Sequence, residues 1–177
     1  IAYYGDALDE VTKLAPESLH TMHINRGNRA LPEQFADRLD FYMFQPGHNY
    51  SGQEEAWKLP EDFRAQYPKK PMVNSEPCYE QMGASRNVYW RFTAQDCRAS
   101  VWSSILAGAS AGITYGAHGV WNWQTSQSRG SVLGEGFDMP FRWQECLQFA
   151  GVWDFGLIEH VLRGLGATSA DGAVAVE

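Results

Sequence analysis

The feature that most constrains the fold of this chain is the alternation of short apolar segments with longer helix-like segments. Four segments have the composition of buried strands: residues 19–24, 40–45, 71–75 and 113–115. Segments with helical spacing of apolar residues or helix-start signals surround them: residues 7–14, 31–35, 53–66, 96–109 and 141–165. Strands spaced roughly 20 to 40 residues apart with helices between them are typical of parallel βαβ units. The pattern predicts an α/β fold, either half of a (β/α)8 barrel or part of a doubly wound sheet.

Polar and aromatic residues gather after three of the predicted strands. His48 follows the second strand, Glu76 the third, and the fourth is followed by His118, Trp121 and Trp123. The carboxyl ends of barrel strands form one rim, so a barrel would bring these side chains together. A doubly wound sheet is disfavoured because no strand leads into a glycine-rich phosphate turn that opens a helix. The sequence therefore favours a half barrel of the (β/α)8 TIM type.

Size and charge narrow the class of protein further. The 177 residues can form one domain with a real core, which we place at residues 1–165, followed by a flexible tail or linker at residues 166–177. The net charge of −7 provides no basic stripe for nucleic acid. No apolar run approaches the ~20 residues that a membrane span requires. We expect neither nucleic acid nor membrane as a partner.

One carboxylate stands out by its position. Glu76 ends an apolar run and precedes Pro77, which restrains the residue before it to extended conformations, so the strand should end there. A glutamate at a strand exit has the place of a catalytic carboxylate at a barrel mouth. Retaining glycosidases need two carboxyl groups about 5 to 5.5 Å apart. Glu80 lies beyond Pro77, and Asp40 begins its strand and should lie at the opposite end, so no second acid clearly faces Glu76.

Other chemistries find little support in the sequence. His20 and His23 lie three apart on a predicted strand and should face opposite sides, and H-x-H and H-E-x-x-H patterns are absent. We therefore expect no metal site, and nothing indicates a cofactor. The three cysteines show no C-x-x-C spacing, which disfavours a structural zinc or a redox dithiol and leaves one disulfide open. No G-x-S-x-G nucleophile elbow occurs.

Three blocks of sequence together resemble the apiosidase-like glycoside hydrolases. These are residues 39–48, 70–80 and 107–123, in the family's order and with similar spacing. The resemblance implies a (β/α)8 barrel whose fifth to eighth strands are the four predicted here. It also implies a periplasmic or secreted enzyme that acts on a carbohydrate.

The resemblance assigns a role to Glu76 as well. It takes the place of the catalytic glutamate after the seventh strand, by implication the nucleophile. The family's acid/base aspartate follows the fourth strand and would precede Ile1. Asp6 is the nearest candidate in this chain, but it adjoins a helix instead of ending an apolar strand.

Six further residues near the predicted rim are expected to bind substrate: His48, Asn74, Tyr79, His118, Trp121 and Trp123. The histidines are expected to hydrogen-bond sugar hydroxyls or to orient the glutamate, and Asn74 and Tyr79 to hold it in its rotamer. The two tryptophans alternate along an extended segment and should share a face, as a platform for a sugar ring. The alternative for each residue is ordinary packing at the top of the barrel.

The combined prediction is a glycoside hydrolase acting on a plant or other complex polysaccharide by a two-carboxylate mechanism, with this chain carrying only the nucleophile. The alternative is a non-catalytic carbohydrate-binding barrel or scaffold. An unrelated barrel isomerase or lyase would call for a metal or phosphate site. A half barrel exposes two sheet edges, so we expect the chain to need a missing N-terminal half or a second copy and to be inactive alone.

Overall fold

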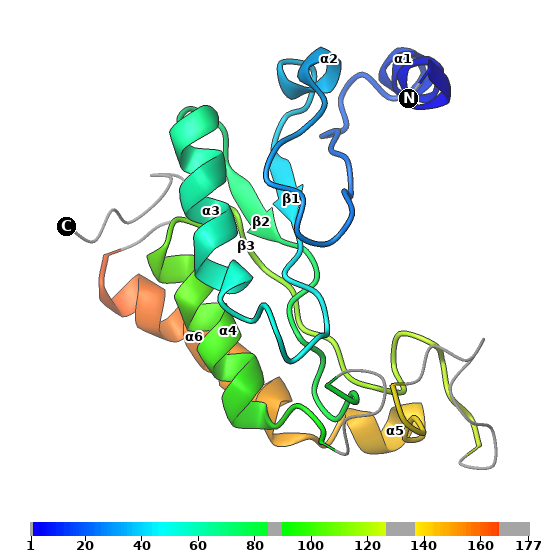
Figure 1. The fold of residues 1–177 in the computed structure, drawn as a ribbon, viewed down its shortest axis with the longest axis vertical. Helices are drawn as coiled ribbons and strands as arrows, with labels where there is room; N and C mark the ends of the chain where they lie inside the picture. Colours follow the sequence, from blue (N-terminus) through cyan, green and yellow to red (C-terminus); the bar gives the residue numbers. More distant parts are fainter. Residues whose placement is uncertain (1, 85–89, 127–136, 167–177) are drawn as a thin grey trace.

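The centre of the molecule is a three-stranded parallel sheet (Figure 1). The computed structural model describes residues 2–84, 90–126 and 137–166. The strands β1 (Tyr42–Phe44), β2 (Met72–Asn74) and β3 (Gly112–Ile113) are neighbours in the order of the sequence. Their register is set by the pairs Tyr42–Met72, Phe44–Asn74 and Asn74–Ile113. The three strands confirm the second, third and fourth predicted strands, in shorter form.

The helices also follow the prediction closely. They are α1 (Ala2–Leu14), α2 (Glu33–Ala36), α3 (Glu55–Gln66), α4 (Ala94–Leu106), α5 (Trp143–Cys146) and α6 (Ala150–Gly164). The last predicted helix is therefore two helices. Residues 127–136, and residues 167–177 of the predicted tail, lie outside the described residues. No helix of the described part is long and apolar enough to cross a membrane.

The first predicted strand is wrong. Residues 19–24 run beside β1 but form no strand. The contacts to the residues that flank β1 are mixed: the Asp40 N–H donates to the His20 carbonyl, whereas the Gln45 side-chain amide donates to the Ile24 carbonyl. Because side chains replace part of the backbone pairing, the segment lies beside the sheet without joining its ladder.

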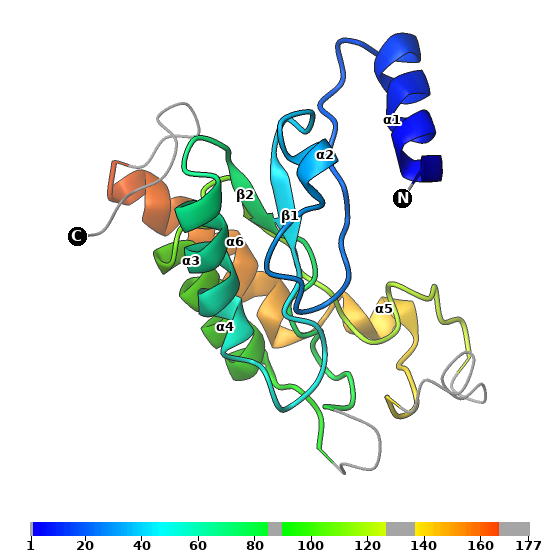
Figure 2. The ribbon, with the colours of Figure 1, turned by 45° about the horizontal axis from the view of Figure 1, so that its top comes forward.

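The helices α3, α4 and α6 lie on one side of the sheet (Figures 1 and 2). The strands alternate accordingly: Tyr42 and Phe44 are buried, and both rings contact Phe63 of α3. The residues that point the other way, Met43 and Val73, are only partly buried. Both crossovers, through α3 and α4, thus return on the same side, as in a singly wound sheet.

The helix α4 begins at a defined capping box. The Asp96 N–H donates to Thr93 Oγ1 at 3.3 Å, and the Thr93 N–H donates to Asp96 Oδ2 at 2.7 Å. This fixes the first turn of the helix, which carries Cys97. The Cys97 thiol lies 4.0 Å from that of Cys78, and both are buried free thiols, as is Cys146.

Candidate active site

Glu76 lies two residues beyond the end of β2, and a series of hydrogen bonds connects its backbone to α4 and α3. Its backbone N–H donates to Asn74 Oδ1 at 3.3 Å. The Asn74 amide in turn donates to Ser104 Oγ of α4 at 2.8 Å, and that hydroxyl donates to the Ala56 carbonyl of α3 at 2.7 Å. Asn74 is fully buried, so its predicted contact with substrate does not fit the structure. Asn74 holds the backbone N–H of Glu76 and makes no hydrogen bond to the carboxylate whose rotamer it is predicted to hold.

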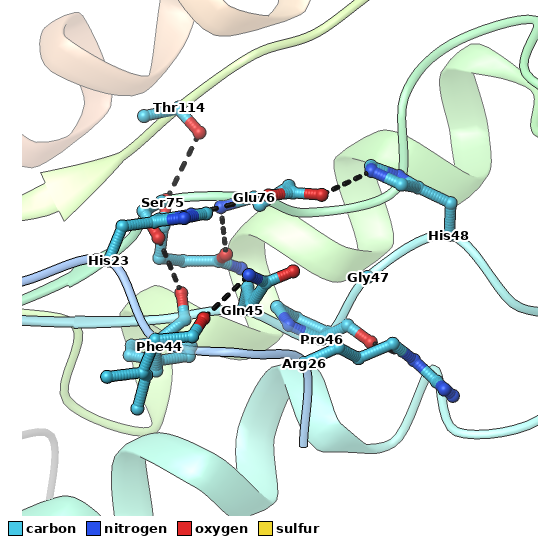
Figure 3. Close-up of polar contacts among 12 residues, drawn as sticks. His23, Arg26, Phe44, Gln45, Pro46, Gly47, His48, Ser75, Glu76 and Thr114 are labelled. Carbon is cyan, nitrogen blue, oxygen red and sulfur yellow. Dashed lines mark hydrogen bonds and ion pairs between the residues drawn. The ribbon is translucent and has the colours of Figure 1, made fainter. Parts of the chain in front are cut away.

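Two imidazoles approach the Glu76 carboxylate, one at each oxygen (Figure 3). His48 Nε2 lies 2.8 Å from Oε1, and His23 Nε2 lies 3.3 Å from Oε2. The His48 side chain is 10% exposed, Glu76 24% and His23 45%. His23 is not among the predicted site residues, although it lies near the carboxyl end of a segment beside β1, as His48 follows the carboxyl end of β1 itself.

Glu76 and His48 open onto a pocket of about 420 Å³. Its walls come from Arg26, Gln45, Gly47, His48, Asn49, Glu76, Tyr79, Met82, Trp121 and Phe137. The Tyr79 ring packs on the His48 ring with 4.2 Å between centroids. Burial and the nearby charge of Glu76 raise the pKa of Tyr79 to about 12, so its phenol stays protonated as a hydrogen-bond donor.

The two tryptophans separate instead of sharing a face. Trp121 lines the pocket and is 43% exposed. Trp123 does not line it and stacks on Trp143, with 4.5 Å between ring centroids. The predicted extended segment is in fact a turn, closed by the Trp123 N–H donating to the Val120 carbonyl at 3.0 Å. The turn leaves Trp121 as the candidate sugar platform and places Trp123 outside the pocket.

His118 is fully buried and does not line the pocket. A direct contact with a sugar hydroxyl therefore does not fit this structure. The ring lies parallel to that of Trp121 at 6.4 Å, and neither nitrogen has a hydrogen-bond partner among the described residues. Burial, with a smaller contribution from the charge of Arg91, lowers the pKa of His118 to about 4. The ring is neutral near pH 7 and supports the Trp121 turn from inside.

His118 should make stability depend on pH. Because the pKa is lower in the folded state than the ~6.5 of an unfolded chain, its contribution is complete above pH ~6.5 and is lost as the pH falls toward 4. We expect about 2 to 3 kcal/mol of the free energy of unfolding to disappear across that window. Urea unfolding of the full-length protein at pH 7 and 4.5 should show a smaller loss in His118→Leu. The exposed His160→Leu is the control, and equal losses in all three proteins would contradict the assignment.

The other acids that the sequence offers as partners of Glu76 do not line its pocket. Glu80 is buried, accepting a hydrogen bond from the Tyr115 hydroxyl at 2.6 Å and another from the Gly151 N–H of α6 at 3.0 Å. Burial, together with the bond to Glu80, raises the pKa of Tyr115. Asp40 accepts from the His20 N–H at 2.7 Å, and Asp6 is exposed on α1, which stands apart from the sheet (Figure 1). Within the described residues, Glu76 is the single carboxylate that lines the pocket.

Metal chemistry gains no support from the described residues, among which no group of three or more histidines, cysteines or acids could hold a metal ion. The two imidazoles at Glu76 approach different oxygens of one carboxylate. The arrangement can hold the Glu76 carboxylate in a fixed orientation at the pocket wall. The phenol of Tyr79 and the indole of Trp121 line the same pocket.

Comparison with known proteins assigns the family. The family described as "Apiosidase-like, catalytic domain" matches residues 1–168. The chain belongs to this family. The resemblance of the three sequence blocks is thereby confirmed. No curated protein matches this apiosidase-like chain.

Two solved structures resemble the apiosidase-like chain over 88% of its length. One is described as a glycoside hydrolase, with a TM-score of 0.71 and 23% identity. The other is a glycoside hydrolase family 5 protein from Bacteroides vulgatus ATCC 8482, with a TM-score of 0.72 and 22% identity. The chain spans 37% and 36% of these two proteins. At this identity the likeness concerns the fold, which is of the α/β type.

Proposed function

We propose that this chain forms the nucleophile-bearing part of a glycoside hydrolase that cleaves glycosidic bonds in a plant or other complex polysaccharide. The observation that carries the proposal is Glu76, at the carboxyl end of a parallel strand and in a pocket wall, with an imidazole at each carboxylate oxygen. Membership of the apiosidase-like family and the fold of the two similar structures support it. A location in the periplasm or outside the cell goes with a polysaccharide substrate.

The proposed reaction has two steps. Glu76 attacks the anomeric carbon as the bond to the leaving oxygen breaks, and an acid protonates that oxygen. Water, deprotonated by the same group, then attacks the glycosyl-enzyme and frees the glutamate. Tyr79 donates a hydrogen bond within the pocket, and Trp121 offers a ring face to the sugar. The acid/base is a second carboxylate from outside the residues described.

We also propose that this chain is one half of a (β/α)8 barrel. Sequential parallel strands with their crossover helices on one side have the arrangement of a barrel arc. The face opposite these helices carries Met43 and Val73, which are only partly buried. A half barrel with the fifth to eighth strands would bury this face against the other half, and the two similar structures are both much longer than this chain. We infer that the isolated chain is inactive.

A non-catalytic carbohydrate-binding barrel is the second candidate, because Glu76 is the single carboxylate at the pocket among the described residues. The test is to incubate the full-length protein with a panel of aryl glycosides and pectic oligosaccharides and to measure both sugar release and binding. We expect at least one substrate to be hydrolysed. Binding without any release would favour the binding protein, and neither binding nor release would overturn both candidates.

A further inference from the structure

We propose that His23 is a positioning residue for Glu76, so that the carboxylate is held by two histidines. The inference rests on the proposed function. His48 is bound to Oε1 at 2.8 Å, and His23 lies 3.3 Å from the other oxygen, Oε2 (Figure 3). A carboxylate held at one oxygen can still rotate about its last carbon–carbon bond. A second imidazole at the other oxygen restrains that rotation and keeps the carboxylate in a reactive orientation.

The two histidines are held in different ways. His48 is nearly buried, and its ring contacts those of Tyr79 and Phe137, with centroid separations of 4.2 and 6.2 Å. His23 is 45% exposed and stands on the segment that lies beside β1 without joining the sheet. Ring packing therefore holds the His48 side chain in place. The position of the more exposed His23 depends on how its backbone segment is held.

Two hydrogen bonds hold the backbone segment that carries His23. Thr21 Oγ1 donates to the Phe41 carbonyl at 2.8 Å, and the Gln45 amide donates to the Ile24 carbonyl at 2.7 Å. These two bonds lie on either side of His23 in the sequence and tie its segment to the residues immediately before and after β1.

Arg26 extends the same connection to the loop of His48. Its Nε donates to the Pro46 carbonyl at 3.0 Å, and its Nη2 donates to the Ser51 carbonyl at 3.1 Å. The Arg26 side chain lies so close to Gly47 that a Cβ there would overlap its Cδ, and Gly47 has φ of +78°. The segment of His23 and the loop of His48 are thus fastened to each other, and both meet at Glu76.

The first test compares matched variants of the full-length enzyme. We expect His23→Phe, which keeps a planar ring without a donor, to lower kcat about ten- to a hundredfold with KM changed less than about threefold. His23→Gln retains an N–H donor and should recover most of kcat. His20→Phe, on the same segment but away from Glu76, should leave kcat unchanged. An unchanged kcat in His23→Phe, or an equal loss in His20→Phe, would overturn the proposal.

A double-mutant cycle separates positioning from direct substrate binding. Glu76→Asp withdraws the carboxylate by about one carbon–carbon bond, out of reach of His23. His23→Phe should then cause little further loss of kcat in the Glu76→Asp background. An equal loss in both backgrounds would show that His23 acts independently of Glu76 and would refute the inference.

Nuclear magnetic resonance can test the contact between His23 and Glu76 independently of the proposed hydrolysis. In nitrogen-15-labelled protein, the ring signals of His23 should move in Glu76→Gln while those of His20 stay in place. Unmoved His23 signals would count against the contact itself. If the signals move but Glu76→Gln leaves hydrolysis intact, the proposed nucleophile is wrong, and a positioning role for His23 in catalysis is overturned with it.

Discussion

Glu76→Gln in the full-length enzyme is expected to lower kcat about a thousandfold or more, equivalent to about 4 kcal/mol of transition-state stabilisation. Glutamine has the size of glutamate and can still accept from His48 at its carbonyl oxygen, so folding should change little. The neutral amide cannot form the glycosyl ester that the proposed mechanism needs. Initial rates with the best aryl glycoside, alongside the thermal unfolding midpoint, would measure both effects.

The control for this variant is Glu54→Gln, which removes an exposed carboxylate outside the pocket. It should leave kcat unchanged. A further variant, Glu76→Ala, makes room for azide, which should restore cleavage and yield a glycosyl azide of inverted configuration if Glu76 is the nucleophile. Full activity of Glu76→Gln would exclude that role, whatever the substrate.

Gly151→Ala is expected to destabilise the protein by about 2 to 4 kcal/mol. A methyl group at this position of α6 would overlap Oε2 of the buried Glu80 and lie 3.1 Å from the Tyr115 ring. The same carboxylate oxygen accepts the Gly151 N–H and the Tyr115 hydroxyl, so it cannot retreat without breaking one of these bonds. Urea unfolding of the full-length protein at pH 7 should show the loss.

A second glycine of α6 provides the control. A Cβ at Gly156 would have no atom within 4 Å, so Gly156→Ala should add helix propensity and raise stability by up to about 1 kcal/mol. The two substitutions make the same chemical change in the same helix and are expected to act in opposite directions. Equal effects would mean that contact with Glu80 does not decide the outcome.

The sequence predicted those features that depend on local chain chemistry. Pro77 predicts that the strand before it ends at Glu76, and β2 ends two residues earlier, at Asn74. The alternation of apolar segments and helices predicted the three parallel strands, since each apolar run is buried against the helices.

The remaining features depend on contacts between distant segments. Residues 19–24 look like a strand, but side-chain hydrogen bonds with Phe41 and Gln45, which flank β1, replace the regular ladder. Strand geometry predicts that His20 and His23 face opposite sides, but it does not predict the contact of His23 with Glu76, which joins residues far apart in the chain. Burial of His118 and the turn that separates Trp121 from Trp123 likewise follow from packing, which residue spacing does not encode.

The hydrogen-bonded connection beneath Glu76 has a consequence for engineering. Asn74, held by Ser104, fixes the backbone of Glu76 from the side of α3 and α4, whereas Trp121 supplies a surface that a ligand would touch. Trp121 can therefore change without touching this connection, whereas His48 both lines the pocket and holds the Glu76 carboxylate. A combinatorial library aimed at new specificity can randomise the exposed Trp121, but it should hold Ser104 constant, although that serine does not line the pocket.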